Sequence, residues 1–336
     1  MCRAGLLLLA LLAGAARVAA DDTESLSRIR DHMRDYLARL PDYTCRVTIE
    51  RAQRRVSRAN FSVLDRLRLE IAFAGGHEYY AWPGDSRFEN TIEELLPERG
   101  MVSEGSWALH MRKLFLTDDA QFGALRTELN GVRVDFLVPS SRSGFAISAA
   151  GVSAPASLRG SVWFDPETLD VRRLEVRVED TPRSVRIAGT REVTTYANSV
   201  VGDVPAVLPV SSELVLRDRD GSERRNRTRF DDCHRYAGSA TVRYDPAVEA
   251  APEKSAAHEE LKRGQRVEIR FDAGIPEDVA IGDVFTSGSA SVRVTDVRQL
   301  GERWSLEFSL IGARGTVRRT LSLPAPPGLS ITLRVE

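Results

Sequence analysis

Apolar and polar residues alternate along many short segments of this chain. The clearest segment is 66–73, where Leu67, Leu69, Ile71 and Phe73 fall at every second position between charged or small residues. Because successive side chains of a β-strand point to opposite faces, such a segment has one apolar and one charged face. A sheet that meets solvent on one face only is typical of antiparallel strands.

The same alternation recurs on both halves of the chain, in segments 45–50, 132–138, 162–164, 174–178, 267–271 and 304–310, and a further strand is expected near 192–197. Turn sequences separate several of them. Asn130-Gly131 and Asp220-Gly221 are strong hairpin signals, and Asp165-Pro166-Glu167 joins two strands within residues 159–180. The chain is therefore predicted to be mainly β.

Helical periodicity is confined to a few places. Leu26, Ile29, Met33 and Leu37 recur at helical spacing between residues 23 and 40, and Pro41 ends that helix. Shorter helices are expected near residues 91–96 and 107–115, while 140–156, poor in charge and rich in Ser, Ala and Gly, is expected to contain a loop.

These elements predict an α+β fold with an antiparallel curved sheet, or incomplete barrel, covered by an N-terminal helix and short helices. A small all-β domain is expected at the C-terminal end. The expected division is a signal peptide at 1–20, the half-barrel at 21–244, a linker at 245–261, rich in Ala, Pro and charge, and the small β-domain at 262–336.

Residues 1–20 have the features of a signal peptide. Arg3 precedes a short apolar run at 6–12, and small residues at 18–20 precede the expected cleavage point. The alternative is a retained membrane anchor. No later run approaches the roughly 20 apolar residues that a membrane helix needs. We therefore expect a protein exported to the periplasm or the extracellular space, which does not span the membrane after cleavage.

The charge of the chain is nearly balanced. It has 47 basic and 48 acidic residues, and removal of Arg3 and Arg17 with the signal peptide leaves 45 against 48. This balance argues against nucleic acid as a partner. One local exception is the basic run that holds Arg224, Arg225, Arg227 and Arg229. We favour the interpretation that these arginines protect an edge strand from pairing with another chain, and an anion site is the alternative.

Two cysteines, Cys45 and Cys233, remain after signal cleavage. In an exported protein such a pair predicts a disulfide, which would join the first strand of the half-barrel to its last. The alternative is two separate buried thiols.

Chemical motifs are sparse. The sequence lacks the common metalloprotease, phosphate-loop and serine-hydrolase motifs, so no catalytic residue, metal site or cofactor is predicted. His234, next to Asp231 and Asp232, is interpreted as part of a solvated turn rather than a zinc ligand. Asp165 is interpreted as a turn residue that accepts backbone hydrogen bonds, in preference to an acid–base pair with Glu167.

Four aromatic residues are candidates for the lining of a ligand cavity: Tyr80, Trp82, Trp163 and Phe164. Tyr80 and Trp82 are expected to share a face of their strand, while Phe164 and Trp163 are expected on opposite faces. Packing in the core of a sheet predicts the same residue types, so both interpretations stay open.

The order of the elements resembles a known family. An amphipathic N-terminal helix, a strand, the segment DRLRLEIAFAGGHEYYAWPGDSRFE and the late hairpin WFDPETLDVRRLEV resemble the periplasmic lipoprotein carrier and sorting proteins, the LolA-like half-barrels. The resemblance covers about residues 21–244. It implies an incomplete antiparallel barrel closed by helices over an apolar cavity that holds acyl chains.

Two functions follow as hypotheses. The first is an exported, non-enzymatic binding protein that holds an apolar ligand or a lipoprotein acyl chain in the half-barrel, with lipid or lipoprotein as partner. The alternative is a structural or interaction module of the cell envelope that uses the C-terminal β-domain to dock a protein partner. A hydrolase built around His234 is a third hypothesis.

Overall fold

The computed structural model of this chain describes residues 23–85, 87–89, 91–95, 108–129, 131–149, 152–236 and 261–336. Most of these residues lie in β-strands. The predicted signal peptide and almost all of the predicted linker fall outside the described residues. The proposed domain boundaries therefore remain predictions.

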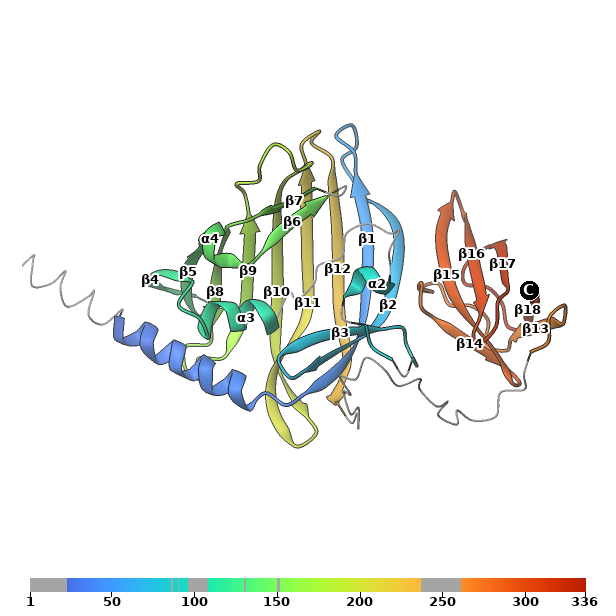
Figure 1. The fold of residues 1–336 in the computed structure, drawn as a ribbon, viewed down its shortest axis with the longest axis horizontal. Coiled ribbons are helices and arrows are strands. Elements are labelled where there is room, and N and C mark those ends of the chain that lie inside the picture. The colour runs from blue at the N-terminus through green and yellow to red at the C-terminus, as the bar shows by residue number, and fades with distance from the viewer. Residues whose placement is uncertain are drawn as a thin grey trace, which may run out of the picture.

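One large antiparallel sheet of ten strands dominates the structure (Figure 1). Its strand order is β3-β2-β1-β12-β11-β10-β9-β8-β5-β4, so the sheet is open and its edge strands are β3 and β4. The strands are β1 (Tyr43–Arg54), β2 (Ser62–Ala74), β3 (His77–Ala81), β4 (Gln121–Glu128), β5 (Gly131–Val138), β8 (Leu158–Phe164), β9 (Val171–Val178), β10 (Ile187–Val201), β11 (Val204–Asp218) and β12 (Glu223–Arg235). The predicted fold class, a curved antiparallel sheet with few helices, is confirmed.

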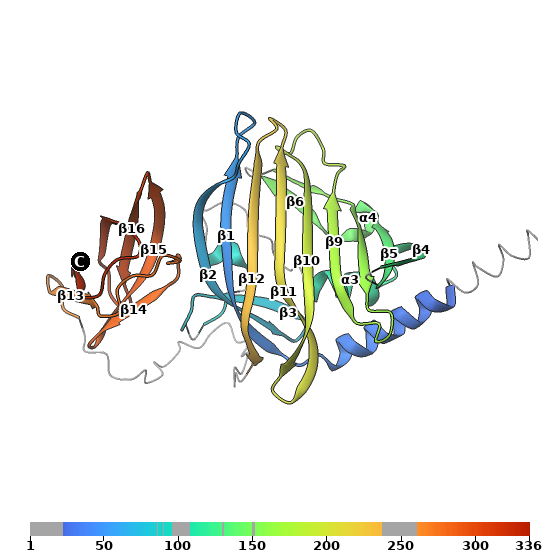
Figure 2. The same ribbon diagram turned by 180° about the vertical axis from the view of Figure 1, so that it is seen from behind.

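The two faces of this sheet differ in what covers them. Figure 1 shows α2 (Ile92–Leu95), α3 (Ala108–Phe115), α4 (Ser140–Ser143) and the hairpin of β6 (Ala146–Ala149) and β7 (Val152–Pro155) in front of one face. We call this face the inner face and these elements together the lid. From behind, strands β1 and β9–β12 have no helix in front of them (Figure 2). We call that side the outer face.

The N-terminal helix covers residues 23–39, close to its prediction. Its apolar side is buried through Ile29, Met33 and Leu37. The hydroxyl of Tyr36 donates a hydrogen bond of 2.7 Å to the carbonyl of Val207 in β11. His32 reaches Asp170 at 3.2 Å, just before β9. The helix is thereby anchored at two separate points of the sheet.

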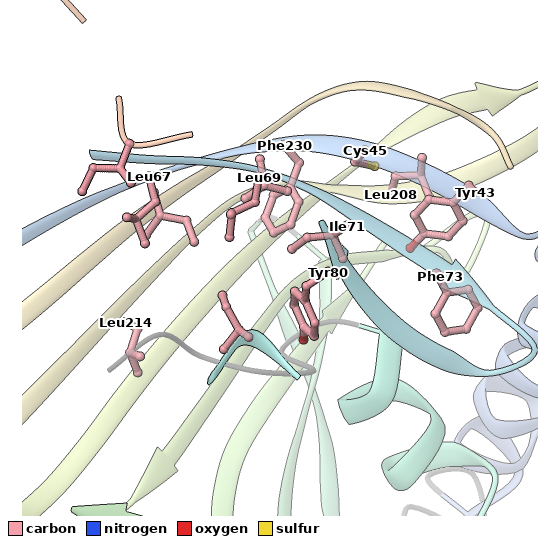
Figure 3. Close-up of a cluster of buried hydrophobic side chains, with 14 of the residues drawn as sticks. Tyr43, Cys45, Leu67, Leu69, Ile71, Phe73, Tyr80, Leu208, Leu214 and Phe230 are labelled. Atoms are coloured by element: carbon pink, nitrogen blue, oxygen red, sulfur yellow. The ribbon is translucent and has the colours of Figure 1, made fainter. Parts of the chain in front are cut away.

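The alternating residues of β2 pack as predicted. Leu67, Leu69, Ile71 and Phe73 are all buried, while Arg66, Arg68 and Glu70 between them remain partly exposed. Figure 3 shows these side chains gathered with Tyr43, Tyr80 and Phe230 from neighbouring strands on the inner face. Burial of such side chains contributes about 1.5–3 kcal/mol each, which makes the inner face the main source of stability.

The predicted disulfide is present. Cys45 in β1 and Cys233 in β12 are bonded across adjacent strands, with Cα atoms 4.1 Å apart and a sequence separation of 188. It closes nearly the whole half-barrel sequence into one loop, as expected for the first and last strands of the sheet.

Three expectations about local structure were wrong or incomplete. β12 is not an edge strand, because it pairs with β1 on one side and with β11 on the other. Edge protection therefore does not explain its arginines. The segment 140–156, expected to contain a loop, holds α4 and the strands β6 and β7. The edge strand β4 was not expected, because its residues do not alternate in burial.

The C-terminal β-region, residues 261–336, has strands only. A four-stranded sheet of order β14-β15-β16-β17 lies beside the pair β13-β18. The strands are β13 (Arg266–Phe271), β14 (Val284–Ser287), β15 (Ala290–Leu300), β16 (Arg303–Leu310), β17 (Thr316–Leu321) and β18 (Leu329–Arg334). Three phenylalanine rings, Phe271, Phe285 and Phe308, contact one another in its core.

The C-terminal β-region contacts the part of β2 that β3 leaves unpaired. Ile281 forms a parallel bridge with Leu67, and its amide and carbonyl bond to the backbone of Arg66 and Arg68 at 2.8 and 2.7 Å. The contact thus continues the edge of the large sheet by one short segment. Among the described residues, no helix is long and apolar enough to cross a membrane.

Candidate functional site

The candidate site is the inner face of the large sheet where the lid covers it. α3 forms a helix with apolar residues on one side, and Met111, Leu114 and Phe115 from that side are buried. The ring of Phe115 lies 5.4 Å from that of Phe122 in β4 and 5.9 Å from that of Phe164 in β8. The lid therefore rests on aromatic side chains at the β4–β8 end of the sheet.

The lid consists of short elements that hold together by a few side-chain contacts. The ring of His110 in α3 stacks on Phe145 at 5.3 Å, which links α3 to the segment between α4 and β6. The hydroxyl of Ser143 donates a hydrogen bond of 2.6 Å to the carbonyl of Ala156. Helices of four to eight residues have little stability of their own, so they depend on the apolar surface beneath them.

The inner face also carries a row of polar groups at one end. Arg51 in β1 donates two hydrogen bonds of 2.6 Å to the carboxylate of Asp65 in β2, and Arg51 lies opposite Asn226 in β12. All three residues are buried. A buried ion pair with good geometry offsets the cost of removing both charges from water, so this row can persist in an otherwise apolar face.

A second polar group lies in β10 and β11. Ser212 donates a hydrogen bond of 2.9 Å to the carboxylate of Glu192 and lies 3.2 Å from the hydroxyl of Thr194. Glu192, Thr194 and Ser212 are buried on the inner side of their strands. The inner face is thus amphipathic: apolar over most of its area, with hydrogen-bonding groups near the middle of the sheet.

A group of buried tyrosines adds neutral hydroxyls to this face. Burial raises the pKa of Tyr36, Tyr43 and Tyr196, and the negative charge of Glu78 raises that of Tyr43 and Tyr196 further. Tyr80 donates a hydrogen bond of 3.0 Å to the carboxylate of Glu78. Tyr36, Tyr43 and Tyr196 therefore stay protonated at neutral pH. A phenol oxygen whose proton is already donated, as in Tyr36 and Tyr80, can still accept a hydrogen bond.

The structure divides the four predicted aromatic residues between different surroundings. Tyr80 and Phe164 are buried on the inner face. Trp163 lies on the outer face between the guanidinium groups of Arg133 and Arg173, at 5.2 and 5.0 Å from its ring. Trp82 lies against the C-terminal β-region, with Arg293 5.9 Å from its ring. A role in ligand binding stays a prediction, and by position it suits Tyr80 and Phe164.

The residues considered for catalysis form ordinary turns. Asp165 accepts hydrogen bonds of 3.0 Å from the amides of Glu167 and Thr168, and with an ion pair to Arg172 these lower its pKa to about 2. His234 is exposed, and its Nδ1 lies 2.9 Å from the carbonyl oxygen of Asp232. Within the part of the chain that the structure describes, no three His, Cys, Asp or Glu side chains are placed to hold a metal ion.

A separate cleft of about 830 Å³ lies where β1, β2 and β12 meet the C-terminal β-region. Its lining is charged, and Arg68 is central to it, with hydrogen bonds to Asp283 at 2.6 Å and to Asp278 at 3.5 Å. Burial raises the pKa of Asp283 despite the neighbouring Arg68. Gly282 lies so close to the carbonyl of Arg68 and the ring of Trp82 that a Cβ there would stand 2.3 and 2.8 Å from them. The cleft is therefore held by close backbone packing as well as by charge.

The sequence interpretation missed the buried polar residues. Arg51 continues the apolar positions of Cys45, Val47 and Ile49, and Asp65 occupies the same phase as Leu67. A charged residue at an apolar position of an alternating strand was the signal that could have revealed them. In β11, Ser212 likewise shares the phase of the buried Leu214 and Leu216. In β10, Glu192 and Thr194 share their phase with Thr190, so no break in an apolar pattern marks them.

Comparisons with known proteins add the following. No protein-family model matches the chain, and no curated protein matches it either. The fold resembles LolA-like proteins. A LolA superfamily protein from Nitrosomonas europaea is 11% identical, with a TM-score of 0.30, over 62% of this chain and 93% of that protein. A DUF1329 family protein from Desulfovibrio piger is 12% identical, with a TM-score of 0.32, over 65% and 95%. Values this low carry no information about what this chain binds.

Proposed function

We propose that the chain is an exported, non-enzymatic binding protein that takes up a single long apolar chain, such as an acyl chain, between the inner face of its sheet and the lid. The observation that carries this proposal is the nature of the cover. An extended apolar face is covered by short separate elements instead of a second sheet. Such a cover can be displaced without loss of the ten-stranded scaffold.

The free energy lost when α3 leaves the sheet is comparable to the free energy gained when an acyl chain is buried in its place. Met111, Leu114 and Phe115 contribute about 1.5–3 kcal/mol each by burial, and this must be given up when α3 is displaced. Each methylene of an entering chain contributes about 0.8 kcal/mol. A chain of about ten or more carbons is therefore needed to replace α3, and shorter chains should bind weakly.

The polar groups of the inner face suit the end of such a ligand. A carboxylic acid, ester or amide at the end of an acyl chain loses its hydrogen bonds to water on entry, which costs free energy unless they are replaced. The hydroxyls of Tyr43, Tyr80 and Tyr196 lie on the same face as the apolar residues. We infer that the phenol oxygen of Tyr80, whose proton is donated to Glu78, accepts a hydrogen bond from an acid or amide at the polar end of the ligand. The disulfide between Cys45 and Cys233 supports export to an oxidising compartment.

A fluorescent fatty acid tests the proposal. The chain should be expressed with its own leader, purified after export and titrated with cis-parinaric acid. Saturable binding is expected, and unlabelled fatty acids should compete with an affinity that rises steadily with chain length, by roughly 0.8 kcal/mol per methylene. Absence of saturable binding, or an affinity that does not depend on chain length, would contradict the proposal.

A lid variant sharpens this test. Leu114→Ala weakens the packing of α3, so displacement of the lid costs less and probe affinity should rise about tenfold or more. Leu116→Ala, just beyond α3 at a side chain that is already 38% exposed, is the matched control and should leave the affinity unchanged. Equal effects of the two substitutions would mean that α3 does not move when the probe binds.

The alternative function, an envelope module that docks a protein partner through the C-terminal β-region, stays a prediction. The contact seen for that region is with β2 of the same chain. A pull-down with the isolated C-terminal β-region would not test it, since independent folding of that region is unknown. Crosslinking of the full exported chain in cells is the appropriate measurement.

A further inference from the structure

The outer face of β8–β12 carries rows of residues that lie directly opposite one another on neighbouring strands, most of them partly or fully exposed and Ser161 and Glu175 buried among them. The first row runs Arg159, Arg177, Arg191, Val215 and Arg225 from β8 to β12. The second runs Ser161, Glu175, Val193, Glu213 and Arg227. The third runs Trp163, Arg173, Thr195, Ser211 and Arg229. We call these fifteen positions the outer-face patch. It holds seven arginines and two carboxylates, a formal excess of five positive charges, in a chain of net charge −1.

The first row is the unusual one. Arg159, Arg177 and Arg191 lie directly opposite one another on three adjacent strands. Like charges at opposed positions of a sheet destabilise it, so this arrangement has a cost. Glu175 relieves part of it: its carboxylate accepts hydrogen bonds from Arg177 at 2.7 Å and from Arg191 at 2.8 and 3.0 Å. No acid of the described residues forms a salt bridge with Arg159 or Arg225.

The explanation favoured from the sequence does not hold for this patch. The arginines of β12 were expected to protect an edge, but β12 lies inside the sheet with both neighbours paired. The face they occupy has no helix in front of it (Figure 2). Arg177, Arg191, Arg227 and Arg229 are about half exposed or more, with side-chain exposure between 46% and 68%. These cations are available to a partner from outside.

A hollow lies beside the middle of the first row, at Arg177, Arg191 and Val215. It has a volume of about 560 Å³, and three arginines, Arg177, Arg191 and Arg217, line it together with Glu179 and Glu223. Guanidinium groups bind phosphate oxygens with paired hydrogen bonds. Several guanidinium groups around one hollow therefore suit a phosphate, which has more acceptor oxygens than a carboxylate. The patch thus combines distributed positive charge with one place that can receive a phosphate.

We propose that the outer-face patch docks the protein on a bilayer that contains anionic phospholipids. A bilayer presents many phosphates that move independently, so it can match charges that lie on adjacent strands, roughly 4.8 Å apart within each row. Each cation near such a surface contributes about 1 kcal/mol, and the effect vanishes beyond the screening distance in salt. A nucleic acid is a poorer match, because its phosphates keep a fixed spacing along each strand and cannot rearrange to meet three parallel rows.

This inference deepens the proposed function, because a carrier of acyl chains must meet a membrane to exchange them. The inner face of the sheet would then bind the acyl chain, and the outer face would bind the bilayer. The two proposals can fail separately, since vesicle binding is measured without any fatty acid present, and fatty-acid binding is measured without vesicles.

Vesicle co-sedimentation tests the inference on the exported chain purified with its disulfide intact. Vesicles of phosphatidylcholine with about 30% phosphatidylglycerol should bind the protein, and pure phosphatidylcholine vesicles should bind it far less. Binding should be lost between about 0.05 M and about 0.5 M salt. Binding that is independent of phosphatidylglycerol or of salt would overturn the proposal.

Matched variants assign the effect to the patch. Arg159→Gln together with Arg225→Gln should weaken binding to the anionic vesicles by roughly tenfold to 30-fold, from two lost charges. Arg263→Gln together with Arg314→Gln removes the same charge from exposed positions of the C-terminal β-region and should have little effect. Equal weakening by both pairs would overturn the assignment.

Two further measurements keep the outcome clear. Arg159→Glu alone changes an exposed side chain and provides a second variant if the double substitution reduces folding, which a thermal melt detects. Both outer-face variants should bind cis-parinaric acid as the wild type does. Retention on heparin without any vesicle binding would assign the patch to a polyanionic partner and would overturn the bilayer proposal.

Discussion

The two faces of the large sheet are formed by the same strands, yet they differ in the residues they carry and in what covers them. Trp163 and Phe164 are neighbours in β8, but Phe164 is fully buried against the lid, while Trp163 lies between two arginines on the outside. The inner face is apolar with a few buried polar groups, and the outer-face patch holds seven arginines and two carboxylates. The comparison shows that one alternating sequence can encode a packing surface and a charged surface at once.

The two faces also differ in how strongly the fold constrains the residues on them. An inner-face residue must fit the volume and polarity left by the lid and the N-terminal helix. An outer-face residue is constrained only by its cross-strand neighbours and by whatever contacts it from outside. Three opposed arginines on the outer face lower the stability of the sheet, and packing does not require them. Such a pattern therefore indicates a binding partner, which a pattern on the inner face would not.

The largest effect is expected from the two neighbouring aromatics. Phe164→Ala removes a fully buried ring that packs on Phe115 and should lower the free energy of unfolding by about 4 kcal/mol. Trp163→Ala removes ring contacts with Arg133 and Arg173 and the hydrogen bond to Glu128, and should cost about 1–2 kcal/mol. Urea unfolding followed by circular dichroism measures both. A larger loss for Trp163→Ala would contradict the assignment of the two faces.

A smaller effect separates two ion pairs of the same kind. Asp65→Asn leaves the buried Arg51 on the inner face without its carboxylate and should cost about 3 kcal/mol. Glu213→Gln on the outer face leaves Arg227, whose side chain is 56% exposed, in contact with water and should cost below about 0.5 kcal/mol. The two substitutions remove the same charge, so the difference in urea midpoint reports burial. Equal midpoints would mean that water reaches the Arg51–Asp65 pair.

Much of this architecture followed from alternation in the sequence. Strand β2 was predicted because every second residue is large and apolar: Leu67, Leu69, Ile71 and Phe73. The hairpin of β11 and β12 was predicted from Asp220-Gly221. The disulfide followed from two cysteines in an exported chain. The strand and the hairpin depend on local physics, which a single sequence contains, and the disulfide could be predicted because only two cysteines remain to pair.

The rest depended on which strands become neighbours. The sequence around Arg224 to Arg229 cannot say whether β12 lies at an edge, because its partner β1 is almost 180 residues away in the chain. The same holds for Trp82, which packs against a glycine near the C-terminus. The edge strand β4 has no alternation to detect, since most of its side chains are exposed. Sheet order, and with it the outer-face patch, emerges only from the assembled fold.

The smallest effect concerns the acid among the opposed arginines. Burial raises the pKa of Glu175, but hydrogen bonds from Arg191 and Arg177 outweigh it and bring the pKa to about 2, against 4.5 for an ordinary glutamate. Because the folded pKa is depressed, this residue stabilises the fold above pH 4.5, and the contribution is lost as the pH falls from about 4.5 to about 2.

Glu175→Gln therefore tests the stability of the outer-face patch and its binding to vesicles in one variant. At pH 7 it should lower the free energy of unfolding by on the order of 1 kcal/mol, since solvent screens the arginines around it. The difference in free energy of unfolding between the variant and the wild type should shrink by more than half at pH 3. This difference reports Glu175 alone, because the other carboxylates titrate equally in both proteins. The same substitution adds one net positive charge to the outer-face patch, so binding to phosphatidylglycerol vesicles should strengthen about fivefold while stability falls. Weaker vesicle binding in step with weaker stability would instead show that Glu175 positions the arginines for the surface.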